Sequence, residues 1–334
     1  STLLASSAAS DVYKRQICAI DAQHSFHIEE SMYVMITEQS SVSREQMLQI
    51  AEKYRLNYTI INNADLRNGA WRAFRCFFRS IFFSSHAFSY DYAFLGDSSE
   101  KQLTIYSVIS LKRKGHFIYL DDGVATINFL NNGLPLTKRL MYFYKAIKSI
   151  LSFEDRLFYT TYFEMKQSRF VLLPNTFSFF RQKMVVQKNS DRAYVIGPPT
   201  EEYCKLLGIA IHSYLHIIDK LFTYIKVNFS DNIIYIPHRR DTCKGIMDLC
   251  DKYNVIYERL SVPIELFFIE SSYKPSVIFG CGSSALFTAK ILYPDLQIYN
   301  IYIEEHGVTD TKQNDDIANV YQDKGILKLL DTQL

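Results

Sequence analysis

Residues 233–253 read IIYIPHRRDTCKGIMDLCDKY. The first four are apolar and rich in β-branched side chains, a short uninterrupted run that is typical of a fully buried strand. From Thr242 to Tyr253 the apolar residues recur at intervals of three and four, which predicts a helix. A buried strand followed directly by a helix is the repeating unit of parallel sheets that are covered by helices.

The same alternation continues on both sides of this stretch and predicts an α/β fold with two Rossmann-like domains. In the second half we expect further strands at Ala193–Ile196, Val255–Glu258, Val277–Phe279 and Gln297–Ile303, and helices at Glu201–Lys226 and Ser283–Leu292. In the first half we expect strands at Ile17–Ile20, Tyr58–Ile61, Tyr90–Leu95 and Phe117–Leu120, and helices from Ser43 to Tyr54 and from Leu66 to Phe82. The aromatic-rich segment from Phe129 to Lys188 is expected to hold helices and a crossing connection.

The length of 334 residues suits two domains of about 150 residues each. The polar run Gln187–Arg192 is the expected linker, so the N-terminal domain would span residues 17–188 and the C-terminal domain residues 189–334. Residues 1–16 are rich in Ser and Ala and end in a charged stretch that looks like a translated sequencing-adapter scar. We therefore expect a non-native or disordered leader there.

Composition narrows the class of protein. Hydrophobic residues make up 48% and charged residues 22%, which is ordinary for a globular protein. The net charge is +2 and no long basic tract is present, which argues against a nucleic-acid partner. Six cysteines without a CxxC pair favour reduced thiols in the cytoplasm. No apolar run reaches the roughly 18 residues of a membrane helix.

A zinc site is also not expected. His212 and His216 have the four-residue spacing of two ligands on one helix face. No HExxH pattern accompanies them, and their apolar neighbours indicate a packed helix.

Three polar motifs follow predicted strands, where ligands bind in open parallel sheets. The first is Asp121-Asp122-Gly123, after the strand Phe117–Leu120. Two carboxylates followed by a glycine that permits a sharp turn suit a general base. The alternative interpretation is an acidic turn with a helix-capping Asp.

The second motif is Pro237-His238-Arg239-Arg240, after the strand Ile233–Ile236. A histidine and two arginines can donate several hydrogen bonds to a phosphate, and a protonated His238 would neutralise charge on a departing phosphate. The alternative is a basic helix N-terminus, which would oppose the helix dipole.

The third motif is Gly280-Cys281-Gly282-Ser283-Ser284, between a strand and a helix. The glycines allow close approach of the backbone, and the N–H groups of the helix start, with two hydroxyls, form an anion cradle. As a lone Gly-x-Gly the signal is weak, but its place after a strand strengthens it.

The order and spacing of the three motifs resemble those of the bacterial sialyltransferases, including the lipooligosaccharide and polysialic-acid-forming groups. Asp121-Asp122-Gly123 is similar to their acidic Asp/Glu-Asp/Glu-Gly motif, His238 to their His-Pro histidine, and Ser283-Ser284 to their Ser-Ser/Thr motif. Glu265 lies where that family carries a glutamate that binds the ribose of CMP.

This resemblance implies the GT-B type of fold, in which two Rossmann-like domains face a central cleft, with an acceptor-side N-terminal domain and a C-terminal domain that binds the nucleotide sugar. It implies inverting transfer of sialic acid from CMP-sialic acid to a cell-surface glycan, a lipooligosaccharide or capsular polysaccharide. No metal or other cofactor would take part. The enzyme would work in the cytoplasm of a bacterium, with peripheral contact to the inner membrane as a further expectation.

The resemblance also implies roles for particular residues. Asp121 or Asp122 would take the proton of the acceptor hydroxyl, and His238 would stabilise the leaving phosphate. Substrate-binding roles would fall to these residues: Gly123, Pro237, Arg240, Glu265, Gly282, Ser283 and Ser284.

Two departures from the family pattern leave alternatives open. The His-Pro motif reads His238-Arg239 here, with the proline displaced to Pro237. The lipooligosaccharide enzymes carry their base in a Gly-x-Pro-Asp-like segment, where this chain has Gly197-Pro198-Pro199-Thr200. Glu201 or Glu202 could replace that aspartate as the base. A glycosyltransferase that uses a UDP-hexose, and a catalytically silent sugar- or nucleotide-binding protein, remain the alternative functions.

Overall fold

A computed structural model of the 334-residue chain divides it into two compact units, Ser1–Phe179 and Phe180–Leu334. The structure describes residues 2–6, 12–37, 41–62, 88–96, 101–123, 125–132, 138–165, 168–303 and 311–334. The division lies upstream of the predicted boundary after residue 188. Residues between the two points contact the second unit, since the Gln187 side chain donates to the carbonyl oxygens of Phe268 and Ser271.

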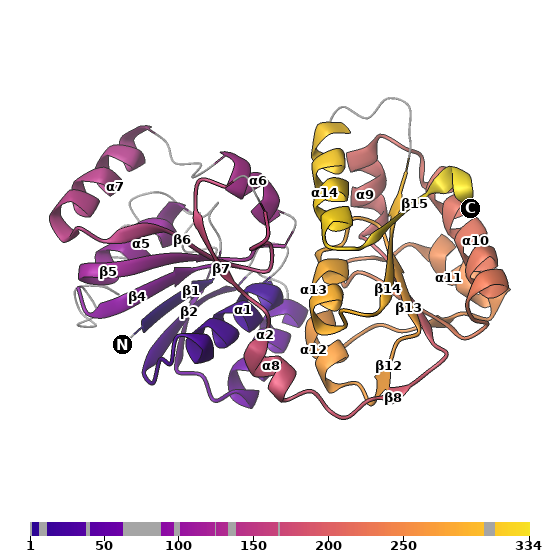
Figure 1. The fold of residues 1–334 in the computed structure, drawn as a ribbon, viewed down its shortest axis with the longest axis horizontal. Helices are drawn as coiled ribbons and strands as arrows, with labels where there is room; N and C mark the ends of the chain where they lie inside the picture. The colour runs from indigo at the N-terminus through magenta and orange to yellow at the C-terminus, as the bar shows by residue number, and fades with distance from the viewer. Residues whose placement is uncertain are drawn as a thin grey trace. The chain divides into compact units, whose positions relative to one another are not determined.

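The described part of the first unit contains a seven-stranded parallel sheet in the order β3-β2-β1-β4-β5-β6-β7. Its strands are β1 (Thr2–Ser6), β2 (Ser31–Thr37), β3 (Tyr58–Asn62), β4 (Tyr90–Leu95), β5 (Leu111–Leu120), β6 (Glu154–Thr160) and β7 (Val171–Pro174). Its helices are α1 (Val12–Ser25), α2 (Ser41–Lys53), α5 (Lys101–Ser110), α6 (Ala125–Asn132), α7 (Lys138–Leu151) and α8 (Ser178–Gln182), of which α8 crosses into the second unit. Figure 1 shows helices packed along this sheet.

Strand β1 lies within residues 1–16, the segment expected to be a non-native or disordered leader. Residues 2–6 pair with β2 on one side and with β4 on the other, and α1 begins at Val12. The facing edges of β2 and β4 present N–H and C=O groups that need partners. The short apolar run Leu3-Leu4-Ala5 supplies a strand that fits between them. Residues 2–6 and 12–16 therefore belong to the sheet and to its first helix.

Other predicted elements of the first unit had mixed outcomes. The strands at β3, β4 and the end of β5 are confirmed, as is the helix α2. The predicted strand Ile17–Ile20 is wrong, because these residues lie buried in α1. A short buried apolar run has the same pattern in a strand and in a buried helix. The predicted helix Leu66–Phe82 lies outside the described residues.

The second unit contains, in its described part, a six-stranded parallel sheet in the order β11-β10-β9-β13-β14-β15. Its strands are β9 (Ala193–Ile196), β10 (Ile233–Ile236), β11 (Ile256–Tyr257), β13 (Val277–Gly280), β14 (Gln297–Tyr302) and β15 (Leu327–Leu330). Its helices are α9 (Thr200–Leu207), α10 (Ile211–Asn228), α11 (Lys244–Tyr253), α12 (Ile264–Glu270), α13 (Ser284–Leu292) and α14 (Thr311–Asp323). A small sheet pairs β8 (Lys188–Asn189) with β12 (Tyr273–Lys274), and a 3₁₀ turn spans Asp331–Gln333.

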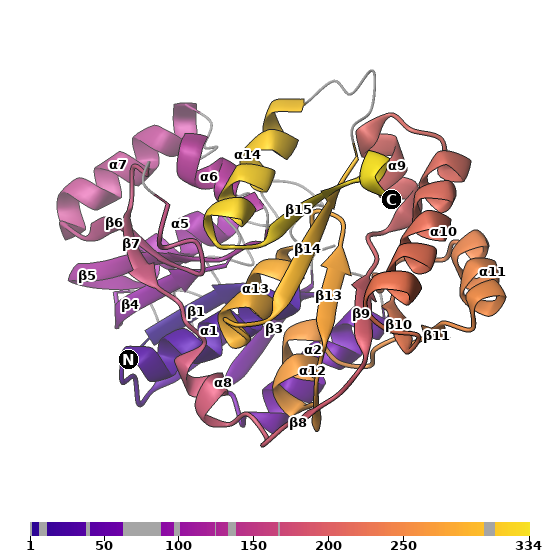
Figure 2. The ribbon, with the colours of Figure 1, turned by 45° about the vertical axis from the view of Figure 1, so that its right-hand side comes forward.

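Helices cover both faces of this second sheet, as Figures 1 and 2 show. Within β9, the side chain of Val195 packs into the core under α10 and α11, while the neighbouring Tyr194 ring contacts Phe267 of α12. Since successive strand residues alternate between faces, both faces of the sheet need apolar cover. This is why the strands of the second unit read as uninterrupted apolar runs.

Both sheets reverse their strand order at one point. In the first unit the chain moves from β1 outward to β2 and β3, and then resumes at β4 on the other side of β1. In the second unit it moves from β9 to β10 and β11, and then resumes at β13 on the other side of β9. In open α/β sheets such a switch point is where ligands bind, beyond the carboxyl ends of the strands.

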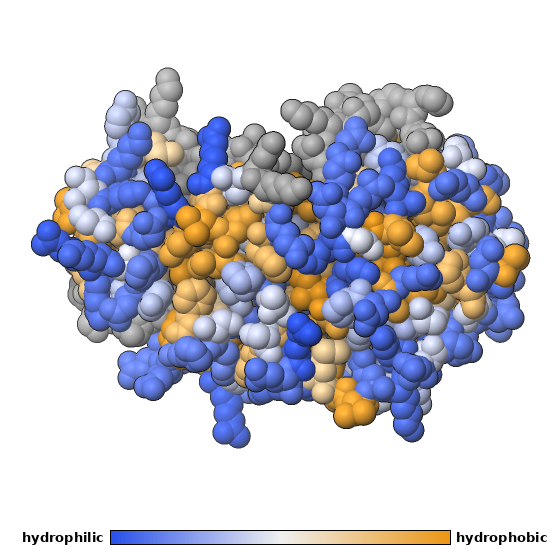
Figure 3. Space-filling view, in the orientation of Figure 1, coloured by the Kyte–Doolittle hydropathy of each residue, from blue (hydrophilic) through white to orange (hydrophobic). Residues whose placement is uncertain are grey.

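The viewed face of the molecule has an ordinary polar surface. In Figure 3 hydrophilic side chains cover much of it, with smaller apolar patches between them. Within the described residues, no helix combines the length and the hydropathy that spanning a membrane requires.

Candidate functional site

The carboxyl ends of β9, β10 and β13 lie at one level. Ile196, the last residue of β9, is the register partner of both Ile236 and Gly280, which end β10 and β13. Neighbouring strands lie about 4.8 Å apart, so the two outer strand ends are roughly 10 Å from each other. The loops that carry His238 and the Ser283-Ser284 pair therefore leave the sheet on either side of the Gly197–Thr200 loop.

Residues His238 to Asp241 form a closed turn after β10. The Asp241 N–H donates to the His238 carbonyl oxygen at 2.8 Å, and the Arg240 N–H donates to His238 Nδ1 at 3.2 Å. Because Nδ1 accepts a hydrogen bond, the neutral imidazole carries its proton on Nε2. In that tautomer the ring has an N–H donor on Nε2.

The buried carboxylate of Asp241 ties this turn to the loop after β9. Its oxygens accept from the Thr200 N–H at 3.3 Å, from the Thr200 hydroxyl at 3.1 Å and from the Cys243 N–H at 3.4 Å. Thr200 is itself buried at the first position of α9. Sequence reasoning missed Asp241, because an Asp before a helix reads as an ordinary turn residue and its partner lies far along the chain.

The third motif forms a tight turn into α13. Gly282 has φ +59°, which a side chain would strain, and its N–H donates to Asn300 Oδ1 at 2.8 Å. Ser283 is the N-cap of α13, with its hydroxyl accepting from the Ala285 N–H at 3.3 Å, and Ser284 begins the helix. The N–H groups of a first helical turn have no intrahelical acceptor, so this turn favours an anion. Asn300 on β14 was not anticipated from the sequence.

Cys281 lies in this turn but is not a nucleophile. Burial raises the pKa of its thiol to about 12, which keeps it protonated at neutral pH. The Tyr214 hydroxyl lies 3.9 Å from its sulfur, and burial raises the pKa of Tyr214 well above its ordinary value. The thiol is part of the packing beneath the turn.

Four charged residues of interest lie around these loops. Arg240 forms an ion pair with Glu202 of α9 at 2.9 Å, with both side chains largely exposed. Glu201 is exposed beside it. Glu265 is buried in the first turn of α12, the helix that packs against α13. Arg240 and Glu202 thus connect the His238 turn to the start of α9.

The acidic motif belongs to the first unit and follows β5. Asp121 is fully buried, and its carboxylate accepts from the Thr160 hydroxyl and, at 2.7 Å, from the Thr161 N–H. These two hydrogen bonds join the ends of β5 and β6. Gly123, which ends the motif, has φ +57° and so needs to be glycine or to be strained.

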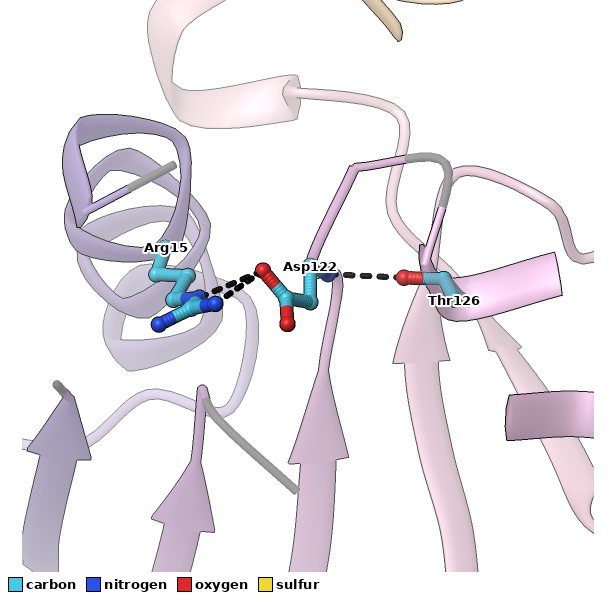
Figure 4. Close-up of polar contacts among 3 residues, drawn as sticks. All are labelled: Arg15, Asp122 and Thr126. Atoms are coloured by element: carbon cyan, nitrogen blue, oxygen red, sulfur yellow. Dashed lines mark hydrogen bonds and ion pairs between the residues drawn. The ribbon is translucent and has the colours of Figure 1, made fainter. Parts of the chain in front are cut away.

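Asp122 differs from Asp121 in exposure and in partner. Its carboxylate forms an ion pair with Arg15 of α1, with Nε 2.7 Å from Oδ1, and its N–H donates to the Thr126 hydroxyl at 2.7 Å (Figure 4). The Asp122 side chain is partly exposed, whereas that of Arg15 is buried. Sequence reasoning missed Arg15 because it lies in the segment expected to be a leader.

The structure therefore brings together His238, Pro237, Arg240, Gly282, Ser283 and Ser284 at the carboxyl edge of the second sheet. It gives the two aspartates different environments in the first unit. Asp121 has the surroundings of a structural residue, and Asp122 those of an accessible carboxylate held by a cation.

Comparisons with known proteins identify the fold. No protein-family model and no curated protein matches the sequence. Among solved structures, the chain is similar to an alpha/beta-galactoside alpha-2,3-sialyltransferase from the luminous marine bacterium Photobacterium phosphoreum, with TM-score 0.56 and 12% identity over 100% of this chain and 98% of that one.

The chain is also similar to a Listeria monocytogenes protein described as a UDP-N-acetylglucosamine 2-epimerase, with TM-score 0.50 and 9% identity over 96% of this chain and 86% of the other. At these identities the likeness defines the fold: two Rossmann-like domains of the GT-B type, as the sequence predicted. The resemblance to a bacterial sialyltransferase extends in structure over the whole chain.

Proposed function

We propose that the protein is an inverting, metal-independent glycosyltransferase that moves sialic acid from CMP-sialic acid to a cell-surface glycan. One observation carries this proposal. The His238 turn and the start of α13 leave the sheet at the same level, on either side of Ile196 at the end of β9. In this proposal the His238 imidazole and the N–H groups at the start of α13 bind one phosphate at the switch point of the sheet, and the common level of the two loops supports this. The structural likeness to a sialyltransferase supports the choice of donor.

In this mechanism the leaving group is CMP. The acceptor oxygen forms a bond to the anomeric carbon of sialic acid, and the bond from that carbon to the phosphate oxygen breaks with its electron pair remaining on the phosphate. His238 Nε2–H and the N–H groups at the start of α13 stabilise that charge. Glu265 would bind the ribose, as the family resemblance implies.

The proton of the acceptor hydroxyl goes to a carboxylate, for which we propose Asp122. Asp121 is engaged by Thr160 and Thr161 and is fully buried, so it is the poorer candidate. The alternatives in the second unit, Glu201 and Glu202, are exposed at the start of α9, and Glu202, like Asp122, forms an ion pair with an arginine. Asp122 is partly exposed, and it belongs to the acidic motif in which the family resemblance places the base, so we choose it over Asp121 and the two glutamates.

The test is a panel of nucleotide sugars with the purified chain and a set of glycan acceptors. We expect release of CMP from CMP-sialic acid, and loss of that release in His238→Ala and in Asp122→Asn with folding retained by circular dichroism. Release of UDP from a UDP-hexose would favour the alternative glycosyltransferase. Binding of a nucleotide sugar without turnover would favour the catalytically silent binding protein.

We further propose peripheral contact with an anionic membrane, such as a bacterial inner membrane seen from the cytoplasm, through α7. The sequence of this helix, KRLMYFYKAIKSIL, contains four basic and no acidic residues. Its outward stripe includes Lys145 and two apolar side chains, Tyr142 and Ile150, that are 74% and 71% exposed. Exposed apolar side chains beside lysine on one helix face are the pattern of an interfacial helix.

Vesicle co-sedimentation tests this contact. We expect binding to vesicles that contain phosphatidylglycerol, weaker binding to pure phosphatidylcholine, and loss of binding in Tyr142→Ser/Ile150→Ser. The matched control is Val227→Ser, which removes a comparably exposed apolar side chain from α10 in the second unit. Equal binding by the double variant and the wild type would contradict the role of α7.

A further inference from the structure

The turn that carries His238 accepts hydrogen bonds from Arg259, a residue outside the turn and outside the sequence motifs. Arg259 follows β11, the strand next to β10 in the sheet. Its Nη1 donates to the Arg239 carbonyl oxygen at 2.9 Å, and its Nη2 donates to the Asp241 carbonyl oxygen at 2.6 Å. Nη2 also lies 3.2 Å from the Tyr257 hydroxyl. One guanidinium thus contacts two carbonyls of a four-residue turn.

These contacts account for three carbonyl groups of the turn. The His238 carbonyl accepts from the Asp241 N–H, and those of Arg239 and Asp241 accept from Arg259. A carbonyl oxygen directed at the guanidinium is not directed at an anion, which it would repel. Planar, multiple hydrogen bonding by arginine fixes geometry better than a lysine ammonium can.

The hydrogen bonds that hold this turn also influence the orientation of the His238 imidazole. The Arg240 N–H that donates to His238 Nδ1 lies between the two residues whose carbonyls Arg259 contacts. If those carbonyls were released, the Arg240 N–H could rotate away from the ring. That hydrogen bond favours the tautomer with the proton on Nε2 and helps to orient the ring.

We propose that Arg259 is a positioning residue for His238: by holding the carbonyls of residues 239 and 241 it sets the ring orientation and tautomer with which His238 meets the donor phosphate. This inference deepens the proposed function and rests on it for the identity of the phosphate. The orientation of His238 itself is a property of the ligand-free protein and can be measured separately.

The first measurement is the ¹⁵N NMR spectrum of the His238 ring in the ligand-free protein. The wild type is expected to show the Nε2–H tautomer with Nδ1 as acceptor. In Arg259→Ala the ring signals shift toward a mixture of tautomers, and Arg259→Lys restores them in part. The control is Arg192→Ala, which removes an arginine that stacks on Tyr273, 4.3 Å from the ring centre, and adjoins the amino end of β9. Unchanged His238 signals in Arg259→Ala would overturn the proposal.

The second measurement is a double-mutant cycle on turnover and on CMP binding. We expect Arg259→Ala to lower kcat by about 100-fold, as displacement of a catalytic group by about 1 Å can do. In the His238→Ala background the same substitution should cost little more, because the two residues act through one contact. Additive losses would mean that Arg259 only stabilises the fold. If the wild type releases no CMP while the His238 signals respond to Arg259→Ala, the proposed function fails and the positioning role stands.

Discussion

The hydroxyl of Tyr235 occupies the space in which residue 197 would carry a side chain. A Cβ on Gly197 would lie 1.9 Å from Tyr235 Oη and 2.5 Å from Cζ. Tyr235 is fully buried in β10, and Gly197 opens the loop after β9. The Tyr235 ring of β10 therefore limits how closely the loop after β9, which lies between the loops of His238 and Ser283, can approach it.

This contact predicts the effect of substitution at Gly197. Gly197→Ala would force two buried groups apart, and we expect it to lower the free energy of unfolding of the second unit by about 2–3 kcal/mol. Tyr235→Phe in the same chain removes the 1.9 Å clash but not the one with Cζ, so it should recover only part of the loss. Urea denaturation of the four proteins in the cycle measures this. Full additivity of the two substitutions would contradict the contact.

The two adjacent aspartates should respond differently to the same change. Asp121→Asn loses the acceptor of the Thr160 hydroxyl or of the Thr161 N–H in a fully buried place, so we expect a loss of about 2–3 kcal/mol in stability. Asp122→Asn takes the anionic partner from the buried Arg15, so we expect a loss of about 3 kcal/mol in stability, and it also removes the proposed base.

Thermal unfolding and CMP release, measured on both variants, separate these roles. Asp121→Asn should keep its activity at temperatures where it remains folded. An Asp122→Asn variant with wild-type turnover would return the role of base to Glu201 or to another carboxylate.

Asn300 offers a test of the anion-binding turn that leaves the serines in place. Asn300→Leu removes the acceptor of the Gly282 N–H from a buried position. We expect CMP binding to weaken by about tenfold, the equivalent of one lost hydrogen bond of about 1.4 kcal/mol. Isothermal titration with CMP measures this. Asn232→Leu, at an exposed hydrogen bond with Asp191 before β10, is the matched control. Unchanged affinity in Asn300→Leu would exclude the turn from the site.

The cysteines of the second unit should react with iodoacetamide in a defined order. Burial raises the pKa of Cys250 and Cys281 to about 12, so at pH 8 only about one thiol in ten thousand is ionised. As pH rises from 8 toward 12 the reactive thiolate fraction increases. Cys243 is only partly buried and should be alkylated first.

Peptide mapping by mass spectrometry follows the order of alkylation. A denatured sample, in which all four thiols react alike, is the control. Early labelling of Cys281 in the native protein would contradict the packing beneath the Gly282 turn.

The sequence was sufficient for much of the second unit because its strands are buried on both faces. The runs Ala193–Ile196 and Ile233–Ile236 are strands with the predicted bounds. The predicted helix Glu201–Lys226 is interrupted at Gly208, whose φ of +72° ends α9 before α10 begins. A single glycine in a periodic segment does not reveal from sequence alone whether it breaks the helix.

The sequence predicted the motifs of the candidate site but not the contacts that support them. The places of His238 and Ser283 follow from strand ends, which the apolar runs identify. Their supporting contacts join residues distant in sequence, such as Asp241 with Thr200 and Arg259 with the Arg239 carbonyl. No local pattern connects such residues. The different roles of Asp121 and Asp122 likewise depend on what surrounds each carboxylate.

Ile196 of β9 pairs in register with Ile236 of β10 on one side and with Gly280 of β13 on the other. The gap between the loops of His238 and Ser283 is consequently dictated by backbone pairing, whichever side chains those loops carry. A slip of one residue in either ladder would displace a loop by about 3.3 Å and turn its strand's side chains to the opposite face. Substitutions within either loop would therefore change the chemical groups presented there while the spacing between the two loops, set by three paired strands, stays the same.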